Sequence, residues 1–156
     1  MVVAKDSHRS PNAPHLLPNY SPEMVRYGLT MAPMLKTHSA CCTAETTGAP
    51  DFVDITDAIE AALVDSGIRN GQVTVFAPGD GCSLLVNERE TGLLHDLKAT
   101  LGRLKEAWPP AVIGSASVVV PAFEGRLGLG MWQRVLLVEL RAATARPVLV
   151  QVLGEG

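Results

Sequence analysis

Apolar and polar residues alternate in short runs along most of this chain, and the alternation begins at Leu35. A period of two is typical of a strand with one buried face. Clusters of turn residues such as Gly48–Pro50 and Asn70–Gly71 separate the runs. The pattern predicts strands at residues 35–46, 72–78, 82–88, 115–122, 128–140 and 146–154.

Two other segments repeat apolar residues at helical spacing. In residues 51–68 a short strand runs into a helix, which Asp54 or Thr56 can cap and Gly67 ends. The second helix, over residues 91–108, stops before a pair of prolines. The apolar stripes consist of Ile59, Leu63 and Val64 in the first helix and of Leu93, Leu94, Leu97, Leu101 and Leu104 in the second.

The predicted strands are short, mostly linked by hairpins, and rich in Val and Leu. This combination favours an α+β sandwich of mainly antiparallel strands with two helices over a parallel doubly wound sheet. A chain of 156 residues suits one such domain.

Residues 1–33 differ from the rest because they hold five of the eleven prolines. Proline removes backbone donors and opposes regular helix, so we expect an extended or disordered arm here and the folded domain at residues 34–156. His8, His15 and His38 are not paired at metal-ligand spacing. Solvated histidines are therefore favoured over a metal site, and neither a metal nor a cofactor is expected.

Composition narrows the classes of partner. Charged residues make up 19% of the chain and its net charge is −3, which gives no reason to expect nucleic acid or an acidic membrane. No window approaches the roughly 18 apolar residues that a membrane-spanning helix needs. Three cysteines, Cys41, Cys42 and Cys82, make an odd count, and no apolar signal segment precedes them. We therefore expect a cytoplasmic protein.

The break at residues 78–81 contains two glycines, which raises the question of a phosphate-binding loop. Neither the lysine nor the following helix of such a loop is present, so a simple turn is favoured. Gly128 and Gly130 lie inside a predicted strand, where glycine more often marks a bulge. Cys82 follows the break and is a weak candidate nucleophile, with His95 as its base; a buried, inert thiol is favoured.

Two further groups of residues are candidates for a site. Asn87, Glu88 and Glu90 form an acidic cluster where a strand meets the second helix, although carboxylates there also stabilise a helix N-terminus. Trp132 and Gln133 are adjacent on a predicted strand and should point to opposite faces. One of the two is therefore expected to face a pocket or a subunit interface.

Five blocks of sequence, in this order, resemble the YjbQ-like family over about residues 50–155. The most specific block carries Gly-Arg-Leu at 125–127, Gly-x-Trp-Gln at 130–133 and a downstream acid, Glu139. Some members are described as secondary thiamine-phosphate synthases. The resemblance implies an α+β sandwich that assembles as a homotrimer, with its site at the subunit boundary. The blocks are "DFVDITDAIEAALVDSGI", "GQVTVFAP", "LLVNERE", "GRLGLGMWQRVLLVEL" and "RPVLVQVLGE".

The chain also departs from the family pattern. Family members typically place a histidine directly after the proline of the "TVF-x-P" strand, where this chain has Gly79, followed by Asp80 and Gly81. Family members carry a loop with two further histidines between the second helix and the Gly-Arg-Leu block. Here residues 108–110, at the end of the predicted helix, lead almost directly into residues 111–114, so that loop is missing. Met131 replaces a threonine. The residues that remain to shape a pocket are Asn87, Glu88, Arg126, Trp132, Gln133 and Glu139.

These features predict a degenerate member of the family that acts through binding or assembly. The expected partners are two further copies of the chain and a small-molecule ligand, with no nucleic acid or membrane. One alternative is an enzyme with secondary thiamine-phosphate synthase-like activity, using Glu88, Asp80 or Cys82 in place of the missing histidines. Another is a module that captures a partner through residues 1–33, and a paralogue that completes the site in a hetero-oligomer also stays open.

Overall fold

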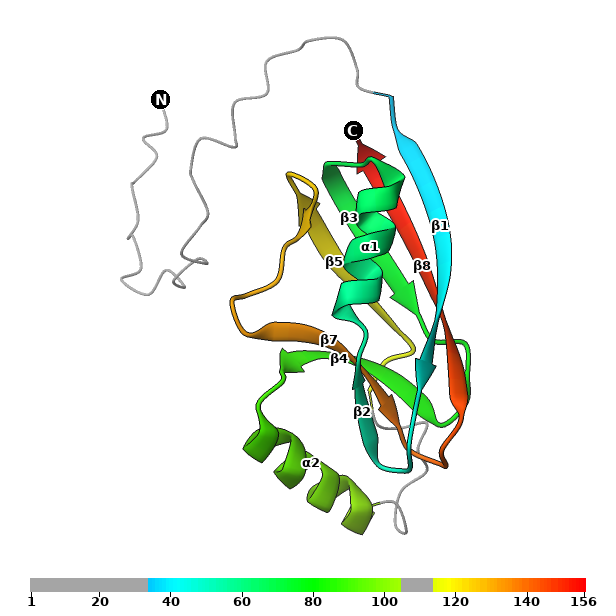
Figure 1. The fold of residues 1–156 in the computed structure, drawn as a ribbon, viewed down its shortest axis with the longest axis vertical. Coiled ribbons are helices and arrows are strands. Elements are labelled where there is room, and N and C mark those ends of the chain that lie inside the picture. Colours follow the sequence, from blue (N-terminus) through cyan, green and yellow to red (C-terminus); the bar gives the residue numbers. More distant parts are fainter. Residues whose placement is uncertain (1–33, 105–113) are drawn as a thin grey trace, which may run out of the picture. The chain divides into compact units, whose positions relative to one another are not determined.

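A computed structural model describes residues 34–104 and 114–156 and shows an α+β sandwich of antiparallel strands with two helices, which confirms the predicted fold class (Figure 1). The expected arm at 1–33 and the proline stop at 109–110 lie outside the described residues. The strands are β1 (Lys36–Glu45), β2 (Asp51–Asp54), β3 (Asn70–Phe76), β4 (Cys82–Glu88), β5 (Ser117–Phe123), β6 (Arg126–Leu127), β7 (Gln133–Glu139) and β8 (Ala145–Glu155). The helices are α1 (Thr56–Ser66) and α2 (Thr91–Leu104).

The strands form two sheets. The larger has the order β1-β8-β3-β5-β6 and the smaller the order β2-β7-β4. Most neighbours are distant in sequence: β1 pairs with β8 over its whole length, from Lys36 opposite Gly154 to Glu45 opposite Ala145. The expectation of mostly hairpin-linked strands is therefore wrong.

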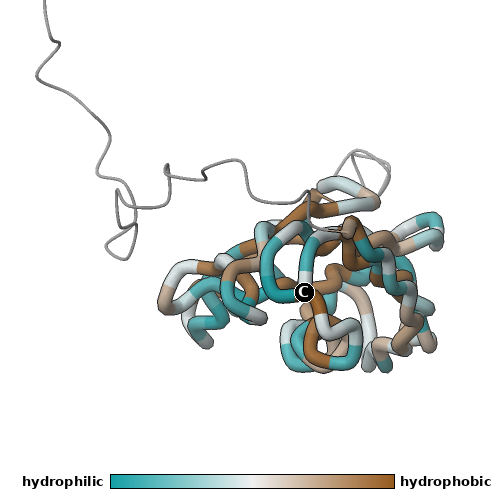
Figure 2. Tube along the Cα trace, turned by 90° about the horizontal axis from the view of Figure 1, so that it is seen from above, coloured by the Kyte–Doolittle hydropathy of each residue, from teal (hydrophilic) through white to brown (hydrophobic). Residues whose placement is uncertain are grey.

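The hydrophobic core lies between the larger sheet, the smaller sheet and α1. Hydrophilic and hydrophobic residues are mixed along the trace (Figure 2). The inward valines of β8 and β3 are fully or almost fully buried. From α1, Ile59 and Leu63 enter this core, whereas Val64, predicted for the same stripe, is 68% exposed. The core includes Ile59, Leu63, Val73, Val75, Leu84, Val135, Leu137, Val148, Val150 and Val152.

The start of α1 is attached to the smaller sheet by its own polar groups. The N-cap of α1 is Ile55, which makes no side-chain capping bond, so the prediction of Asp54 or Thr56 as the cap is wrong. The carboxylate of Asp54, one residue earlier, accepts a hydrogen bond from the Thr56 amide at 3.0 Å. The Thr56 hydroxyl instead accepts from the amide of Val135 on β7 at 2.8 Å. These two contacts fix where the acidic first turn of α1 meets β7.

Two glycine-containing segments differ from prediction. Asn70 and Gly71 belong to β3 itself rather than to a turn before it. Gly128 and Gly130 lie in the loop between β6 and β7, not inside a strand. That loop is closed by hydrogen bonds between Gly130 and Gln133: the Gln133 amide donates to the Gly130 carbonyl at 3.0 Å, and the Gly130 amide donates to Gln133 Oε1 at 2.8 Å.

Helix α2 is joined to the sheet by an ion pair. Lys98 Nζ lies 2.8 Å from Asp51 Oδ1 at the start of β2. Burial would raise the pKa of Asp51, but hydrogen bonds from Lys98, Thr47 and the Phe52 amide outweigh it and lower the pKa to about 2. No residue of α2 is fully buried, so this pair is a main attachment of the helix among the described residues.

Acid should therefore weaken the fold through Asp51. Its pKa is lower when folded than the usual 3.8, so its stabilisation is present above about pH 4 and is lost as the pH falls towards 2. We expect about 1–2 kcal/mol, reduced by the solvent that screens the half-exposed Lys98. Urea unfolding at pH 7, 4 and 2 should show a smaller acid loss in Lys98→Met than in the parent. An equally reduced loss in Arg69→Met, which removes an exposed charge elsewhere, would contradict this account.

Candidate functional site

The strand pair β4–β7 carries most of the candidate site residues, and it places them at its two opposite ends. Cys82 pairs with Glu139 at one end, and Glu88 pairs with Gln133 at the other. Six residue steps at about 3.4 Å each put these ends roughly 20 Å apart. Arg126 lies on β6 in the other sheet and is exposed. The candidates thus form two separate groups.

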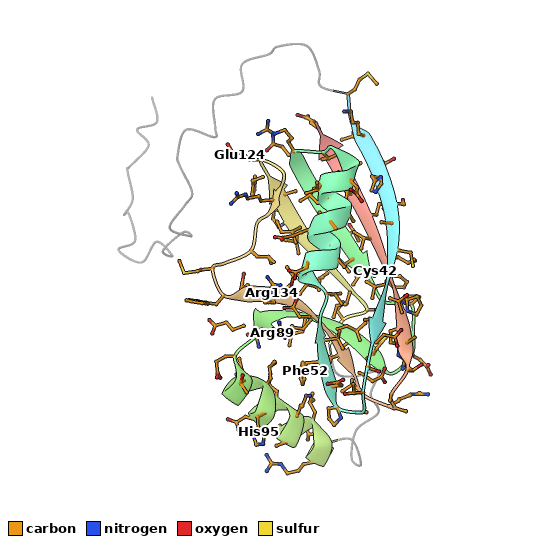
Figure 3. The ribbon with its side chains drawn as sticks, viewed as in Figure 1. Cys42, Phe52, Arg89, His95, Glu124 and Arg134 are labelled. Atoms are coloured by element: carbon orange, nitrogen blue, oxygen red, sulfur yellow. The ribbon has the colours of Figure 1, made fainter. Side chains whose placement is uncertain are left out.

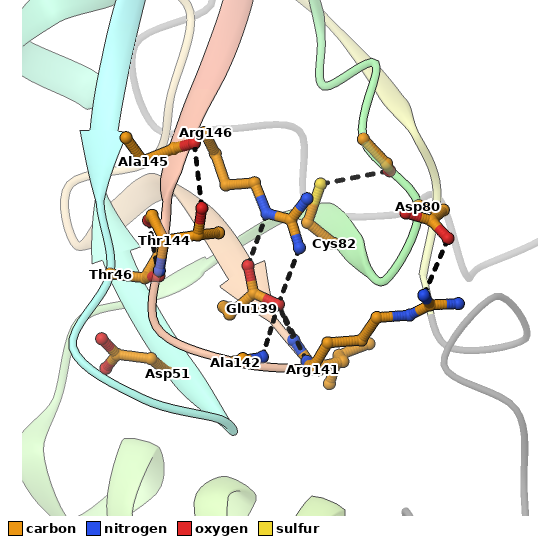
Figure 4. A network of polar contacts seen from close by, with 12 residues as sticks. Thr46, Asp51, Asp80, Cys82, Glu139, Arg141, Ala142, Thr144, Ala145 and Arg146 are labelled. Carbon is orange, nitrogen blue, oxygen red and sulfur yellow. Dashed lines mark hydrogen bonds and ion pairs between the residues drawn. The ribbon is translucent and has the colours of Figure 1, made fainter.

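The first group is centred on Glu139, whose side chain is fully buried (Figure 4). Its Oε2 lies 2.6 Å from Arg146 Nε, and its Oε1 lies 3.0 Å from Arg146 Nη2. Oε1 also accepts the amides of Leu140 at 3.1 Å and Arg141 at 2.8 Å. Burial raises the pKa of Glu139, but the Arg146 guanidinium and these amides lower it further than burial raises it. The carboxylate is saturated with donors and is therefore a structural anion rather than a proton acceptor.

Cys82 and Asp80 lie beside this pair. The Cys82 thiol donates to the Gly79 carbonyl at 3.3 Å, and burial raises its pKa despite the nearby positive charge of Arg146. A half-buried thiol that stays protonated is a poor nucleophile. Asp80 Oδ2 is 2.9 Å from Arg141 Nη1 in an exposed ion pair, which contributes little to stability.

The break at residues 78–81 is a turn between β3 and β4, as predicted. Gly81 has a φ of +77°, a conformation that glycine adopts without strain. A Cβ at Gly79 would lie 2.8 Å from Arg146 Nη1 and 3.2 Å from the Cys82 sulfur. The Arg146 guanidinium therefore occupies the space into which a side chain at residue 79 would project.

The second group borders a hollow of about 500 Å³ where β4 leads into α2. We call it the β4–α2 hollow. It brings together Glu88 and Trp132, both candidates from the sequence, with residues that the sequence reasoning did not assign to a pocket. It is lined by Glu88, Arg89, Glu90, Met131, Trp132 and Arg134.

The arginines of the β4–α2 hollow are held by Asp54, the last residue of β2, and by Asp57 in the first turn of α1. Figure 3 shows Arg89 and Arg134 close together. Arg134 Nε is 2.7 Å from Asp54 Oδ2, and its Nη2 is 2.6 Å from Asp57 Oδ1. Arg89 Nη1 lies 3.5 Å from the same Asp54 oxygen. Burial opposes ionisation of Asp54, yet the Thr56 amide and Arg134 lower its pKa overall. Each of the two guanidinium groups thus has at least one carboxylate partner.

The two glutamates of the hollow differ. Glu90 accepts the amides of Gly92 at 2.8 Å and Leu93 at 2.6 Å, and these donors lower its pKa, so it caps α2. Glu88 is exposed, and its carboxylate has no hydrogen bond or ion pair within residues 34–104 and 114–156. Glu88 is the carboxylate in the hollow that stays available to a ligand.

Trp132 is 70% exposed and Met131 is 86% exposed. Trp132 lies in the turn before β7, so the expectation that it and Gln133 point to opposite faces of a strand does not apply. The Gln133 side chain closes that turn, as described above, and Asn87 Oδ1 accepts the Glu88 amide at 2.9 Å. Gln133 and Asn87 therefore shape the backbone beside the hollow without lining it.

Two other expectations concern histidine and metal. The His95 side chain, the candidate base for Cys82, is 82% exposed on α2 and lies 3.6 Å from Asp96. In residues 34–104 and 114–156 no three His, Cys, Asp or Glu side chains gather where they could hold a metal ion. Neither described helix is long and apolar enough to cross a bilayer.

Comparison with known proteins gives consistent matches. The family described as UPF0047 protein YjbQ-like matches residues 41–110. A UPF0047 protein of Archaeoglobus fulgidus is 34% identical over 126 residues, which cover 71% of this chain and 98% of that protein. A crystal structure of a YbjQ-like protein of unknown function from Sulfolobus solfataricus has a TM-score of 0.73 at 29% identity, covering 78% of this chain and 100% of the other. A hypothetical protein of Aeropyrum pernix has a TM-score of 0.66 at 30% identity, covering 77% and 99%.

Proposed function

The chain belongs to the YjbQ-like UPF0047 family, and from that premise we propose that it is a non-catalytic member that binds a small molecule and assembles as a homotrimer. The observation that carries the proposal is that the acidic and thiol candidates are occupied by structural roles. Glu139 is saturated by Arg146 and backbone amides, Asp80 is paired with Arg141, and the pKa of Cys82 is raised. Glu88 alone among them is available, and it borders the β4–α2 hollow.

An enzyme with secondary thiamine-phosphate synthase-like activity is the second candidate. The available carboxylate of Glu88, next to Trp132 in the hollow, is the observation that favours it. A general base needs a carboxylate that no structural contact already occupies, and Glu88 meets that condition.

The two candidates are separated by a product assay. The purified full chain is incubated with a thiazole phosphate and a pyrimidine diphosphate, and thiamine phosphate is measured by fluorescence after oxidation. We expect no product above the background without protein. Product that forms with the parent chain and disappears in Glu88→Gln, but persists in the exposed control Glu60→Gln, would contradict the proposal and support the enzyme.

The open face of the larger sheet supports assembly. In the middle of this face none of the outward residues of β1, β8, β3 and β5 is Asp, Glu, Lys or Arg, whereas Glu45, Arg126 and Glu155 lie at its margins. Depletion of charged residues at the centre of a surface patch is typical of protein–protein interfaces. The uncharged outward residues are Thr37, Ser39, Cys41, Thr43, Gln72, Thr74, Phe76, Ser117, Val119, Pro121, Pro147, Leu149, Gln151 and Leu153.

Light scattering tests the assembly. Phe76, Leu149 and Val119 are 40%, 45% and 57% exposed on this face, so we expect the parent chain to have the mass of a trimer and Leu149→Lys to be a monomer. The matched control is Val64→Lys, which places the same charge at an exposed apolar residue of α1 and should leave the trimer intact. A monomeric parent chain would contradict the proposed assembly.

A further inference from the structure

The balance of charges around the β4–α2 hollow is negative. Arg134 is shared between Asp54 and Asp57, and Arg89 also faces Asp54. Adding Glu88 and Glu90 gives four carboxylates against two guanidinium groups. A hollow with this balance attracts positive charge and repels negative charge.

An uncovered aromatic ring borders the same hollow. Trp132 is 70% exposed, and its indole makes no ring contact with another residue of the described chain. The hydrogen bonds between Gly130 and Gln133 hold the turn that presents it. The face of an indole attracts a cation electrostatically, and tryptophan does so more strongly than the other aromatic side chains.

The arginines do not offset this preference. Two of the three guanidinium nitrogens of Arg134 are engaged by Asp54 and Asp57 at 2.7 and 2.6 Å. An anionic ligand would compete with these carboxylates for the two engaged nitrogens of Arg134. A cationic ligand would meet Glu88, whose carboxylate has no partner in the described chain, without breaking a contact.

From these observations we infer that the β4–α2 hollow binds a small organic cation, with the indole of Trp132 against its charged, weakly hydrated part and the Glu88 carboxylate as its counter-charge. The inference rests on the proposed binding function and adds the charge class of the ligand. The hollow of about 500 Å³ lies in the usual range for small-molecule sites. Met131, 86% exposed beside Trp132, supplies an apolar edge for the uncharged part of the ligand.

Three probes of nearly the same shape test the charge class: the N-methylnicotinamide cation, neutral nicotinamide and the nicotinate anion. Binding to the full chain is followed by NMR, through the indole Nε1–H resonance of Trp132, which is identified by its loss from the spectrum of Trp132→Leu. We expect the cation to bind at least about fivefold more tightly than nicotinamide, and nicotinate to bind more weakly than either.

Variants separate the two contacts. Glu88→Gln should weaken the cation by about fivefold and leave nicotinamide unchanged. Glu60→Gln makes the same change of charge on the exposed side of α1 and should alter neither. Trp132→Leu, followed by calorimetry, should weaken both the cation and nicotinamide. Added salt should reduce the preference for the cation in the parent chain.

Several results would overturn the inference. These are equal or tighter binding of nicotinate, an unchanged cation preference in Glu88→Gln, or no Trp132-dependent binding of any probe at millimolar concentration. Tight binding of nicotinate in the hollow would be consistent with the proposed small-molecule binding, but it would contradict the inference that the ligand is a cation. Thiamine phosphate formation in the assay described above would contradict the proposed function, whichever probe binds best.

Discussion

Glu139→Gln is expected to lower the free energy of unfolding by about 3–5 kcal/mol, because it removes one partner of a buried ion pair and leaves the other charge uncompensated. The carboxylate is fully buried and accepts two hydrogen bonds from Arg146. Glutamine keeps the shape of the side chain but can accept at only one of the two positions that face the guanidinium. Urea unfolding monitored by circular dichroism measures the loss.

Two further variants test this assignment to the buried pair. Asp80→Asn breaks the exposed pair with Arg141 and should cost less than about 1 kcal/mol. A double variant, Glu139→Gln with Arg146→Met, removes both charges and keeps a side-chain oxygen that can accept the Arg141 amide. It should recover much of the stability lost in Glu139→Gln alone, since no buried charge is left uncompensated. A decrease of less than about 1 kcal/mol in the free energy of unfolding of Glu139→Gln would contradict this account, because it would show that water stabilises the charge of Arg146.

Gly154→Ala is expected to cost about 3 kcal/mol, at the upper end of the range for overpacking. Gly154 on β8 is paired directly with Gly71 on β3 and is buried. A Cβ added there would contact the backbone carbonyl of Asn70 and lie 2.7 Å from Gly71 Cα. Backbone atoms of a central strand cannot move aside as a side chain can, so the two strands must separate.

Gly102→Ala is the matched control, because a Cβ at Gly102 on α2 would meet nothing within 4 Å. Alanine in a helix is favoured over glycine by about 1 kcal/mol, so this variant should be slightly more stable than the parent chain. Both are measured by urea unfolding. Equal stability of Gly154→Ala and the parent would show that β3 and β8 separate without cost.

Prediction from sequence succeeded where the signal is local. Alternation placed β1, β4 and β8 almost to the residue, because one face of each lies on the core. The order of the strands was not predictable in this way: β1 pairs with β8, more than a hundred residues away in places, and nothing in either segment specifies the other. The apolar run at 128–132 predicts a strand, but the Gln133 side chain closes it into a turn.

In the candidate site too, the residues indicated by local sequence features were predicted, and those placed by long-range contacts were not. Asn87, Glu88 and Trp132 were proposed from local features, and the pairing of Glu88 with Gln133 explains why Glu88 and Trp132 border one hollow. Arg134 is not singled out by any local feature, because its place beside Asn87 follows from the pairing of β7 with β4. Asp54 reaches the hollow through the pairing of β2 with β7, where it lies opposite Leu136, and no local pattern encodes that pairing.

The position of Arg146 over Gly79 has a consequence for how this sequence can change. The guanidinium tip is flexible, so a larger side chain at 79 could displace it, but only by disturbing the paired contacts with Glu139. Substitutions at 79, 139 and 146 are therefore epistatic, and an imidazole engineered at the first position has to be combined with a redesign of the other two.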